Sequence, residues 1–514
     1  MRLSRSDLAL SAASGLALGA AFLPWAAGPL AWVAFVPLLV ALERRIEDGV
    51  PLRECFRLGY VGGFAFFLAG THWIALLSDV AMTIPALKYV GWVLAAAYLG
   101  IFWGLAATGA AWLSRRSGVG ARWTFGVTLV LLEWVRGSGD IGFPWFQPGY
   151  TQHALPSLGL AALGGVFGVT VWVLSLNALA TALWRRRTVP AALALAVVLA
   201  AGLGAGAFAR GGAYAPNGTR PRVALIQGFI PGEEKWSGKH QKEILARFLA
   251  LSDSALVVAR AQGGAPPVMV VWPETATGSY LRKQLDQSIE VARWSARNGA
   301  AVFSGYADYS YDENGEPQPW NAAGIWNPDG HLSPMYAKRH LVPFGERMPF
   351  QWLVPALGKV DFGQAEWAQG KGPVVFDGAI GKFSSLICFE SIFPELARAD
   401  VHAGSRCLVI VTNDEWFGES AAVFQHAAMA PFRAVENGVP LLRCANTGIT
   451  EVIDASGRVV SSAPAFRPAV LVDEVPPARE GATPYSRAGD WPVAGTAIAG
   501  LAIAVRRRNV SRSA

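Results

Sequence analysis

Charged residues are scarce in this chain of 514 residues: Asp, Glu, Lys and Arg make up 16% of it, and apolar residues make up 52%. Water-soluble proteins usually carry about 25% charged residues, so the composition argues against a wholly soluble protein. The length suits two or three domains. The net charge is +7, but the basic residues form short Arg clusters between apolar runs. That pattern is typical of membrane topology and argues against nucleic-acid binding.

Cysteine is also scarce, with only Cys55, Cys388, Cys407 and Cys444. Their spacing matches no metal-binding pattern, and four are too few for a disulfide framework. The sequence contains neither a phosphate-binding glycine loop nor a ligand cluster, so we expect no metal and no cofactor. The first apolar run lacks a small-residue cleavage site, so we expect no cleavable signal peptide.

Eight apolar stretches are long enough, or nearly so, to cross a bilayer as a helix, which takes about 20 residues. They lie at 7–25, 28–43, 57–79, 88–114, 122–138, 157–184, 189–209 and 491–505. The second and the eighth are short, and flanking arginines can snorkel to the interface. We therefore predict a polytopic α-helical membrane domain over 1–210 and a last membrane helix within 488–508. A globular domain over 220–484 separates them.

Lys and Arg are missing from alternate short loops, at 80–87 and 139–156. The loops after the second, fourth, sixth and eighth stretches instead hold arginine clusters, such as Arg185–Arg187. The positive-inside rule then predicts both termini in the cytoplasm and the globular domain on the outer face.

The globular region alternates short β-rich runs with helical spacing. Buried strands are predicted at 222–228, 268–272, 301–307 and 407–413, and helices at 239–262, 281–299 and 425–438. Hairpins are predicted around Asn-Pro-Asp-Gly (327–330) and Asp-Ala-Ser-Gly (454–457). This alternation indicates an α/β domain with a mixed sheet.

Three of these segments place a reactive side chain just after an apolar strand: Glu274 in "VMVVWPET", Lys338 in "MYAKRHLVPFGE" and Cys388 in "SSLICFE". A catalytic cysteine needs a base and a nearby positive charge, because the thiolate is the nucleophile. Glu274 can accept the thiol proton. Lys338, with the backbone N–H after the cysteine, can stabilise the thiolate and a tetrahedral oxyanion.

Each residue also has a simpler interpretation. Cys388 can be a small buried hydrophobe, as we expect for Cys407 and Cys444. Glu274 can be a solvated loop carboxylate, and Lys338 a surface lysine. We expect structural roles for two histidines, His340 and His426, and a Cys–His pair is the rival constellation.

Glu, Lys and Cys in this order, within "WPET", "YAKRHLVPFGE", "CFESIFP" and "TNDEWFG", resemble the nitrilase, or carbon–nitrogen hydrolase, superfamily. That resemblance implies an αββα sandwich. Together with the apolar stretches, "QGFIPGEEKW" (227–236) and "FPWFQPGY" (143–150), the whole chain resembles the apolipoprotein N-acyltransferase family of the Gram-negative inner membrane.

The resemblance implies an acyl transfer in two steps. Cys388 would take an acyl chain from a phospholipid, with phosphatidylethanolamine the expected donor, and form a thioester. The α-amino group of an S-diacylglyceryl-cysteine at an apolipoprotein N-terminus would then accept the chain. Glu274 would act as acid and base, and Lys338 as the oxyanion stabiliser. The rivals are a membrane-anchored amidase that transfers the acyl group to water, and a transport or lipid-binding protein with an inactive hydrolase domain. We expect a monomer.

Further residues enter through the same resemblance. Glu346 would hold Lys338 in place, and the alternative is a surface carboxylate. Glu390 would order the nucleophile loop. Phe389 departs from the family, which often has Tyr there, and can form an aromatic wall. Trp236 can pack on an acyl chain or headgroup, or can be an ordinary core or interfacial tryptophan.

Two other segments are notable. Residues 347–358 are apolar and Pro-rich, and form either a lid at the membrane or a buried loop. Glu133 and Arg136, near the end of a membrane stretch, either pair with each other or meet a phospholipid headgroup.

Overall fold

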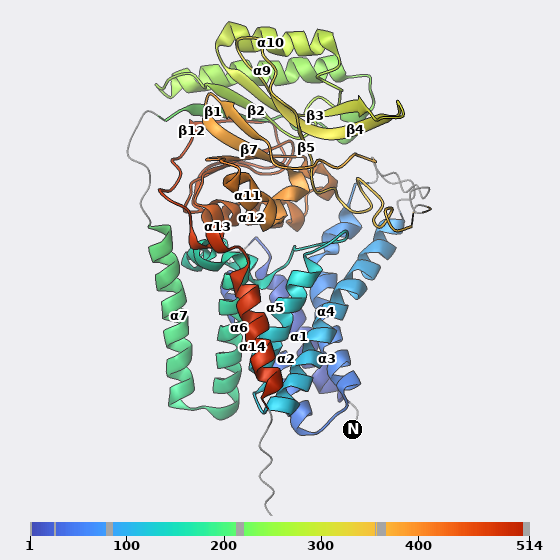
Figure 1. The fold of residues 1–514 in the computed structure, drawn as a ribbon, viewed down its shortest axis with the longest axis vertical. Coiled ribbons are helices and arrows are strands. Elements are labelled where there is room, and N and C mark those ends of the chain that lie inside the picture. Colours follow the sequence, from blue (N-terminus) through green and yellow to red (C-terminus); the bar gives the residue numbers. More distant parts are fainter. Residues whose placement is uncertain are drawn as a thin grey trace, which may run out of the picture. The chain divides into compact units, whose positions relative to one another are not determined.

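The computed structural model describes residues 3–24, 27–78, 86–211, 220–354, 356 and 366–506. The chain forms two compact units (Figure 1). The helical unit takes the described residues of 1–76, 86–210 and 487–514, and the α/β unit takes those of 77–85 and 211–486. Each unit has its own core and is described separately.

The helical unit consists of eight α-helices in its described residues, at or near the eight predicted stretches. They are α1 (Arg5–Ala21), α2 (Val36–Glu47), α3 (Leu52–Gly70), α4 (Leu87–Ser117), α5 (Ala121–Arg136), α6 (Ala161–Arg186), α7 (Val189–Arg210) and α14 (Trp491–Val505). Short 3-10 turns join them, among them η1 (Gly28–Trp32), η2 (His72–Leu76) and η5 (Pro156–Leu160).

Four helical segments of the described chain are long and apolar enough to cross a membrane: Leu52–Leu76, Leu87–Ser117, Pro156–Arg186 and Val189–Arg210. The apolar helix α14 is shorter. The remaining predicted stretches form shorter helices because local sequence ends them. The stretch 28–43, for example, starts as η1 and becomes α2 only at Val36, where Pro37 occupies the first turn.

Small residues let the helices approach closely. A Cβ atom on Gly15 of α1 would clash with the backbone oxygen of Gly62 on α3, and one on Gly59 of α3 would clash with that of Trp103 on α4. Such contacts are typical of membrane helix packing. Asn177 of α6 satisfies backbone groups where the chain is not helical, between η1 and α2. Its Nδ2 donates to Ala31 O (2.8 Å) and its Oδ1 accepts from Phe35 N (2.8 Å).

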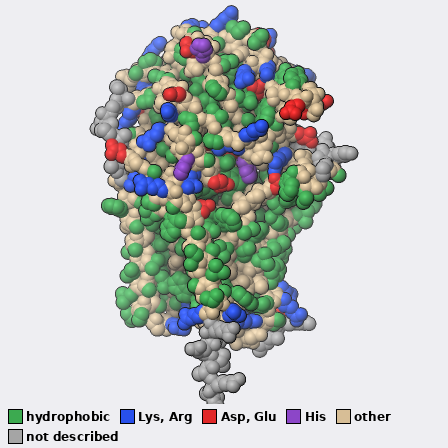
Figure 2. Space-filling view, in the orientation of Figure 1, with side chains coloured by type: hydrophobic (Ala, Val, Ile, Leu, Met, Phe, Trp, Pro, Cys, Tyr) green, Lys and Arg blue, Asp and Glu red, His purple; other side chains and the backbone are tan. Residues whose placement is uncertain are grey.

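Apolar side chains cover most of the face of the helical unit that Figure 2 shows, and Lys and Arg gather at the lower end of that face. There Glu43 of α2 accepts from Arg122 (2.8 Å) and Arg185 (2.9 Å), and Arg185 also meets Glu47 (2.7 Å). These ion pairs join α2, α5 and α6 at one end of the unit.

The α/β unit contains two six-stranded sheets. The first has the order β12-β1-β2-β3-β4-β5 and the second β11-β10-β9-β8-β7-β6. The first comprises β1 (Arg222–Gln227), β2 (Met269–Trp272), β3 (Ala301–Tyr311), β4 (Pro317–Trp326), β5 (Tyr336–Ala337) and β12 (Ala469–Glu474). The second comprises β6 (Val375–Gly378), β7 (Gly381–Ile387), β8 (Leu408–Thr412), β9 (Leu441–Ala445), β10 (Thr450–Ile453) and β11 (Val459–Ala463).

In each sheet the central strands are parallel, β1-β2-β3 in one and β7-β8-β9 in the other, and the flanking strands are antiparallel. The unit also holds α8 (Gly232–Trp236), α9 (Gln241–Ala261), α10 (Leu285–Asn298), α11 (Pro394–His402) and α12 (Ala421–Asn437), and α13 (Pro484–Ala488) lies at its boundary.

Alternation along the strands builds the layers. On β1, Val223 and Leu225 join the core between the two sheets, while Ala224 and Ile226 join the core under α9 and α10. On β8, Val409 and Val411 face the inter-sheet core, and Leu408 and Ile410 pack with α11 and α12. The result is helices, sheet, sheet, helices, so the predicted α/β class and its αββα layering are confirmed (Figure 1).

The predicted strands match β1, β2, β3 and β8, and the predicted helices match α9, α10 and α12. Both predicted turns are present, with Gly330 N bonded to Asn327 O (3.0 Å) and Gly457 N to Asp454 O (2.8 Å). Both glycines have a positive φ, as such turns require.

Candidate active site

The three predicted reactive residues follow strand ends in the α/β unit. Glu274 follows β2, Lys338 follows β5 and Cys388 follows β7 directly. Strands β2 and β5 belong to one sheet and β7 to the other, so the site forms where the ends of the two sheets meet. Lys338 Nζ lies 3.4 Å from Glu274 Oε1, and the charges of both act on the thiol of Cys388.

The carboxylate of Glu274 is buried and held at both oxygens. Asn321 Nδ2 donates to Oε1 (2.8 Å), and the backbone N–H of Asn413 donates to Oε2 (2.8 Å). These bonds fix the direction of the carboxylate while leaving Oε1 beside the amine of Lys338. A fixed carboxylate in this position suits a general base.

Lys338 is buried between two carboxylates, with Glu346 Oε1 at 2.8 Å and Glu274 Oε1 at 3.4 Å from its Nζ. Burial opposes the charged amine, but Glu346 and Glu274 outweigh it and raise the pKa of Lys338 above its ordinary value. The residue is therefore a fixed cation, suited to stabilising a thiolate or an oxyanion and unsuited to acting as a base.

Cys388 is buried and takes a left-handed backbone conformation, with φ at 51°, where β7 turns into the 3-10 helix η7 (Cys388–Ile392). Such a conformation is strained for a residue other than glycine, and residues strained in this way cluster at functional sites. Burial raises the pKa of the thiol, Glu274 adds to this effect, and Lys338 opposes it. The resting thiol is therefore protonated and needs a base before it can attack.

Two further carboxylates support this arrangement. Glu346 binds Lys338, accepts from Asn321 Nδ2 (3.1 Å) and accepts from the backbone N–H of Val342 (2.9 Å). Glu390 is buried and accepts from Tyr336 Oη (2.7 Å) and from three backbone N–H groups, those of Ile387 (2.7 Å), Arg339 (2.5 Å) and His340 (3.1 Å). It thereby ties the turn that holds Cys388 to the segment that holds Lys338.

With this geometry in place, comparison with known proteins identifies the family. The family model of the apolipoprotein N-acyltransferase N-terminal domain matches residues 14–179. The carbon-nitrogen hydrolase family model matches residues 222–485. Apolipoprotein N-acyltransferase of Geobacter metallireducens is 35% identical, covering 98% of this chain and 96% of the relative. That of Azotobacter vinelandii is 33% identical, with the same coverage. The chain belongs to the apolipoprotein N-acyltransferase family.

The chain is also similar to a solved nitrilase-superfamily protein of Saccharomyces cerevisiae, at 20% identity over 52% of this chain and 93% of the other, with a TM-score of 0.38. Family membership makes this protein an enzyme, and its apolar helices make it a membrane protein.

Several residues of the site were not predicted. Asn321 donates to both Glu274 and Glu346, and its only sequence signal is a polar residue inside the apolar strand β4. Thr412 hydrogen-bonds the Cys388 thiol, and its neighbour Asn413 binds Glu274. Both residues belong to the motif "TNDEWFG", which begins at the end of β8, the strand next to β7.

The two histidines have other partners. His426 is buried, with Nδ1 2.9 Å from Asp414 Oδ1 and Nε2 2.9 Å from Ser391 Oγ and 3.2 Å from the carbonyl oxygen of Cys388. His340 packs on Phe393 (ring centroids 3.8 Å apart), and burial lowers its pKa to about 4. His426 therefore supports the backbone at the turn that holds Cys388.

The other cysteines are buried in the sheets or helices. Burial raises the pKa of Cys407 to about 12. The Cys444 Sγ donates to the carbonyl oxygens of Ile226 (3.3 Å) and Val271 (3.2 Å). Both residues fit the predicted buried hydrophobe.

The aromatic candidates differ in exposure. Phe389 is buried and packs edge-on against Phe393 (5.2 Å between ring centroids), so it forms part of an aromatic wall beside Cys388. Trp236 ends α8 with 45% of its surface exposed, which suits contact with a substrate better than a core position.

Glu133 and Arg136 belong to the helical unit and pair with each other while buried. The Arg136 guanidinium also donates to the carbonyl oxygens of Trp145 (2.8 Å) and Phe143, and lies over the ring of Phe67 (5.4 Å). These contacts favour the pairing alternative and fix the "FPWF" loop onto α5.

The segment from Arg347 is described as far as Val354, and at position 356. Residues 355, 357 and 358 of the predicted lid lie outside the described residues. Trp352 is 75% exposed, Leu353 63% and Phe350 38%. The buried-loop alternative is therefore wrong for these three side chains, whereas Met348 is buried.

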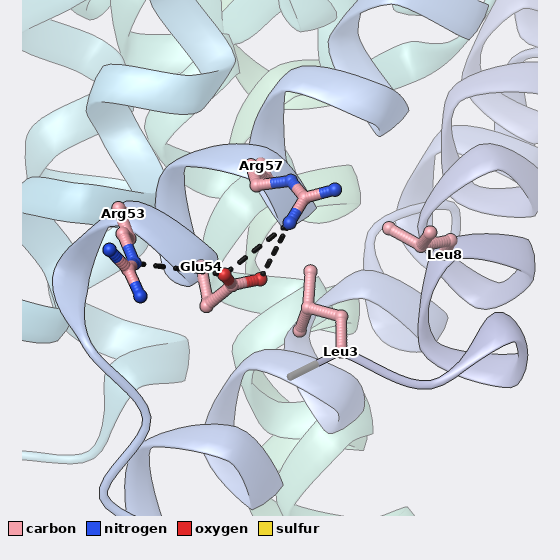
Figure 3. Close-up of a pocket in the computed structure, with 5 residues that line it drawn as sticks. All are labelled: Leu3, Leu8, Arg53, Glu54 and Arg57. Atoms are coloured by element: carbon pink, nitrogen blue, oxygen red, sulfur yellow. Dashed lines mark hydrogen bonds and ion pairs between the residues drawn. The ribbon is translucent and has the colours of Figure 1, made fainter. Parts of the chain in front are cut away.

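A cavity of about 430 Å³ lies in the helical unit and contains none of these residues (Figure 3). Leu3, Leu8, Arg53, Glu54 and Arg57 line it, and Glu54 lies between the two arginines, bonding Arg57 Nη1 at 3.2 Å. Because Glu54 partly neutralises both guanidinium groups, we assign this cavity no function.

Proposed function

We propose that this enzyme N-acylates apolipoproteins through a thioester on Cys388, with Glu274 as general acid and base and Lys338 as the oxyanion stabiliser. The observation that supports this most is the position of Lys338, a permanent cation held by Glu346 beside both Glu274 and the Cys388 thiol. A protonated nucleophile, a base and a fixed cation are the three parts that acyl transfer through cysteine requires.

In the first step the Glu274 carboxylate takes the thiol proton, and the sulfur attacks the ester carbonyl carbon of a phospholipid. Lys338 and the backbone N–H of Phe389 stabilise the oxyanion. The tetrahedral intermediate collapses, the ester C–O bond breaks, and Glu274 returns its proton to the leaving oxygen. A lysophospholipid departs and the acyl chain remains as a thioester.

In the second step the α-amino group of an S-diacylglyceryl-cysteine attacks the thioester carbonyl. Glu274 takes a proton from the attacking amine, the C–S bond breaks, and the proton passes to the sulfur. The products are an N-acylated lipoprotein and the free thiol. Two bulky lipids can use one site in this way because they need not be bound together.

The donor and the supporting residues follow from the same proposal. Phosphatidylethanolamine is the proposed donor, and the enzyme acts as a monomer. Glu346 holds Lys338, Glu390 orders the nucleophile turn, and Phe389 and Trp236 contact substrate. Arg136 instead anchors the "FPWF" loop, because its guanidinium is already occupied by Glu133 and two carbonyl oxygens.

We further propose that all eight helices of the helical unit cross the inner membrane, with 220–484 as the periplasmic catalytic domain between the spans of 1–210 and 488–508. Both termini then lie in the cytoplasm. The position of the helices at or near the eight apolar stretches and the alternation of arginine clusters support this topology.

The deciding experiment measures the intact mass of detergent-purified enzyme incubated with phosphatidylethanolamine alone, for the wild type and Cys388→Ser. We expect a hydroxylamine-sensitive gain of one acyl chain in the wild type only. A diacylglyceryl-cysteine peptide should then remove the chain and become N-acylated. Rapid loss of the adduct to water, with no acylated peptide, would favour the membrane-anchored hydrolase. Lysophospholipid formed at an equal rate by Cys388→Ser would overturn the assignment of the nucleophile.

A further inference from the structure

A second lysine is buried behind the candidate base. Lys235 on α8 has no exposed surface, and its Nζ donates to the backbone carbonyl of Glu274 (3.2 Å) and to Thr275 Oγ1 (3.3 Å). Among the described residues, no carboxylate oxygen lies within ion-pairing distance of this amine. A buried cation without a direct counter-ion is costly, so its presence next to Glu274 calls for an explanation.

The chain at this point is also strained. Thr275 has φ at 43°, in the left-handed region that β-branched residues rarely enter. Its side-chain hydroxyl and the preceding carbonyl are the two groups that Lys235 binds. The amine therefore binds one group on each side of the N–Cα bond of Thr275, and rotation about this bond would relieve the strain.

The surroundings leave this segment little room to move. A Cβ atom on Gly305 of β3 would lie 2.7 Å from the Cα of Glu274, and one on Gly278 would clash with the backbone oxygen of Lys235. The backbone of Glu274 and Thr275 is thus held between β3 on one side and α8 on the other. The side-chain carboxylate of Glu274 hydrogen-bonds Lys338 and the backbone N–H of Asn413.

We propose that Lys235 is a positioning residue for the acyl transfer: by holding the Glu274 carbonyl and the Thr275 hydroxyl, it keeps Thr275 left-handed and the Glu274 carboxylate beside Lys338. This inference rests on the proposed function. Lys235 Nζ faces the backbone of the base rather than its carboxylate, so it acts through Glu274. Burial lowers the pKa of Lys235 to about 8, with Glu274 and Glu415 opposing this shift, and the neutral amine still donates hydrogen bonds.

The test measures the single-turnover rate of Cys388 acylation by phosphatidylethanolamine over a range of donor concentrations. The variants are Lys235→Met, which keeps the shape and removes the amine, and Thr275→Val, which keeps the β-branch and removes the hydroxyl. Lys242→Met, at an exposed site on α9, is the matched control. Small displacements of a reacting group cost about 10- to 100-fold in rate, so we expect a loss of that size for Lys235→Met and a smaller one for Thr275→Val.

The expected losses occur at saturating donor, with the half-saturating concentration and the melting temperature near those of the wild type and of Lys242→Met. A wild-type rate in Lys235→Met, or a loss accompanied by equally weakened donor saturation and a lowered melting temperature, overturns the inference. If Lys235→Met does not fold, Thr275→Val decides alone, with a loss supporting the inference and a wild-type rate overturning it.

A third variant probes the strain. Glycine adopts positive φ freely, so Thr275→Gly in the Lys235→Met background should recover part of the lost rate, and no recovery would contradict the role of the left-handed turn. A wild type that forms no acyl adduct removes the proposed function and this inference together. An adduct in the wild type with unchanged variants removes this inference alone.

Discussion

In the helical unit, the ion pairs of Glu133, Glu43 and Glu47 contain equal numbers of carboxylates and guanidinium groups, whereas each of two buried lysines near Cys388 in the α/β unit faces an unequal number of carboxylates. Glu133 faces Arg136, and the two carboxylates of Glu43 and Glu47 face the two guanidinium groups of Arg122 and Arg185. In the α/β unit, Lys338 faces two carboxylates and Lys235 faces none at ion-pairing distance among the described residues.

The difference follows from what each region must do. Ion pairs with one guanidinium group for each carboxylate join helices. They do not exchange protons, because both partners are stable in their charged forms. Where a group faces an unequal number of opposite charges, its neighbours shift its pKa. Groups with shifted pKa values gather where protons are transferred. The site differs from the helical unit in how its charged groups are arranged, more than in how many there are.

The largest expected effect comes from removing the nucleophile. Cys388→Ala should lower acyl transfer by about 10³-fold or more, because no thioester can form. Cys407→Ala changes an equally buried cysteine in the neighbouring strand region and should retain most activity. Release of lysophospholipid from labelled phosphatidylethanolamine measures both, and similar rates for the two variants would remove Cys388 from the mechanism.

The second effect tests the unbalanced charge directly. Glu346→Gln removes one of the two carboxylates that raise the pKa of Lys338, so this pKa should fall. Since the oxyanion needs the protonated amine, activity should be lost on the alkaline side at a lower pH than in the wild type. Near neutral pH we expect a loss of about 10- to 100-fold, because Lys338 is also less well held.

A pH–rate profile of single-turnover acylation measures this shift. Exposed Glu316, just before β4, offers the control Glu316→Gln, which should keep the wild-type profile. An alkaline limb unmoved by Glu346→Gln would mean that Lys338 does not depend on Glu346 for its charge.

The candidate site residues could be predicted from the sequence because each follows an apolar strand within a motif that resembles the nitrilase superfamily. Glu274, Lys338 and Cys388 lie at strand ends, and ends of neighbouring strands converge in a sandwich. Asn321 and Lys235 were missed for the same physical reason. Their roles depend on pairing between β4 and β5 and on packing of α8, and neither leaves a periodic signal in the chain.

The helices of the helical unit also differ in how much of them could be predicted. Composition located the apolar stretches, but helix ends depend on individual residues. The stretch 122–138 becomes α5 and ends at Arg136, where the N–H of Gly137 caps the helix by donating to Glu133 O (3.0 Å) and a turn follows, with Ser138 N donating to Val135 O (3.1 Å). Apolar composition alone therefore gives the place of a helix better than its length.

The third effect concerns the balanced pair of the helical unit. Glu133→Gln leaves the guanidinium of Arg136 buried without its carboxylate, which should destabilise the protein by about 3 kcal/mol. The double variant Glu133→Gln with Arg136→Met should be less destabilised than either single variant. Thermal melting in detergent measures this, and donor saturation should change little in the double variant. Weakened saturation with unchanged melting would instead indicate headgroup contact.

The smallest expected effect comes from the exposed apolar segment that includes Phe350 and Trp352. Serine at both positions should lower turnover of long-chain phosphatidylethanolamine by about 3- to 10-fold, because partial contact of the two apolar side chains with lipid gives only a small part of the roughly 1.5–3 kcal/mol that full burial gives each. A short soluble ester does not use that contact and should be turned over at the wild-type rate. Neither Phe350 nor Trp352 carries a charge that could act on Lys338, so the pH–rate profile should also stay unchanged. Equal loss on both substrates would show that the segment supports the site itself, and the lid interpretation would then be wrong.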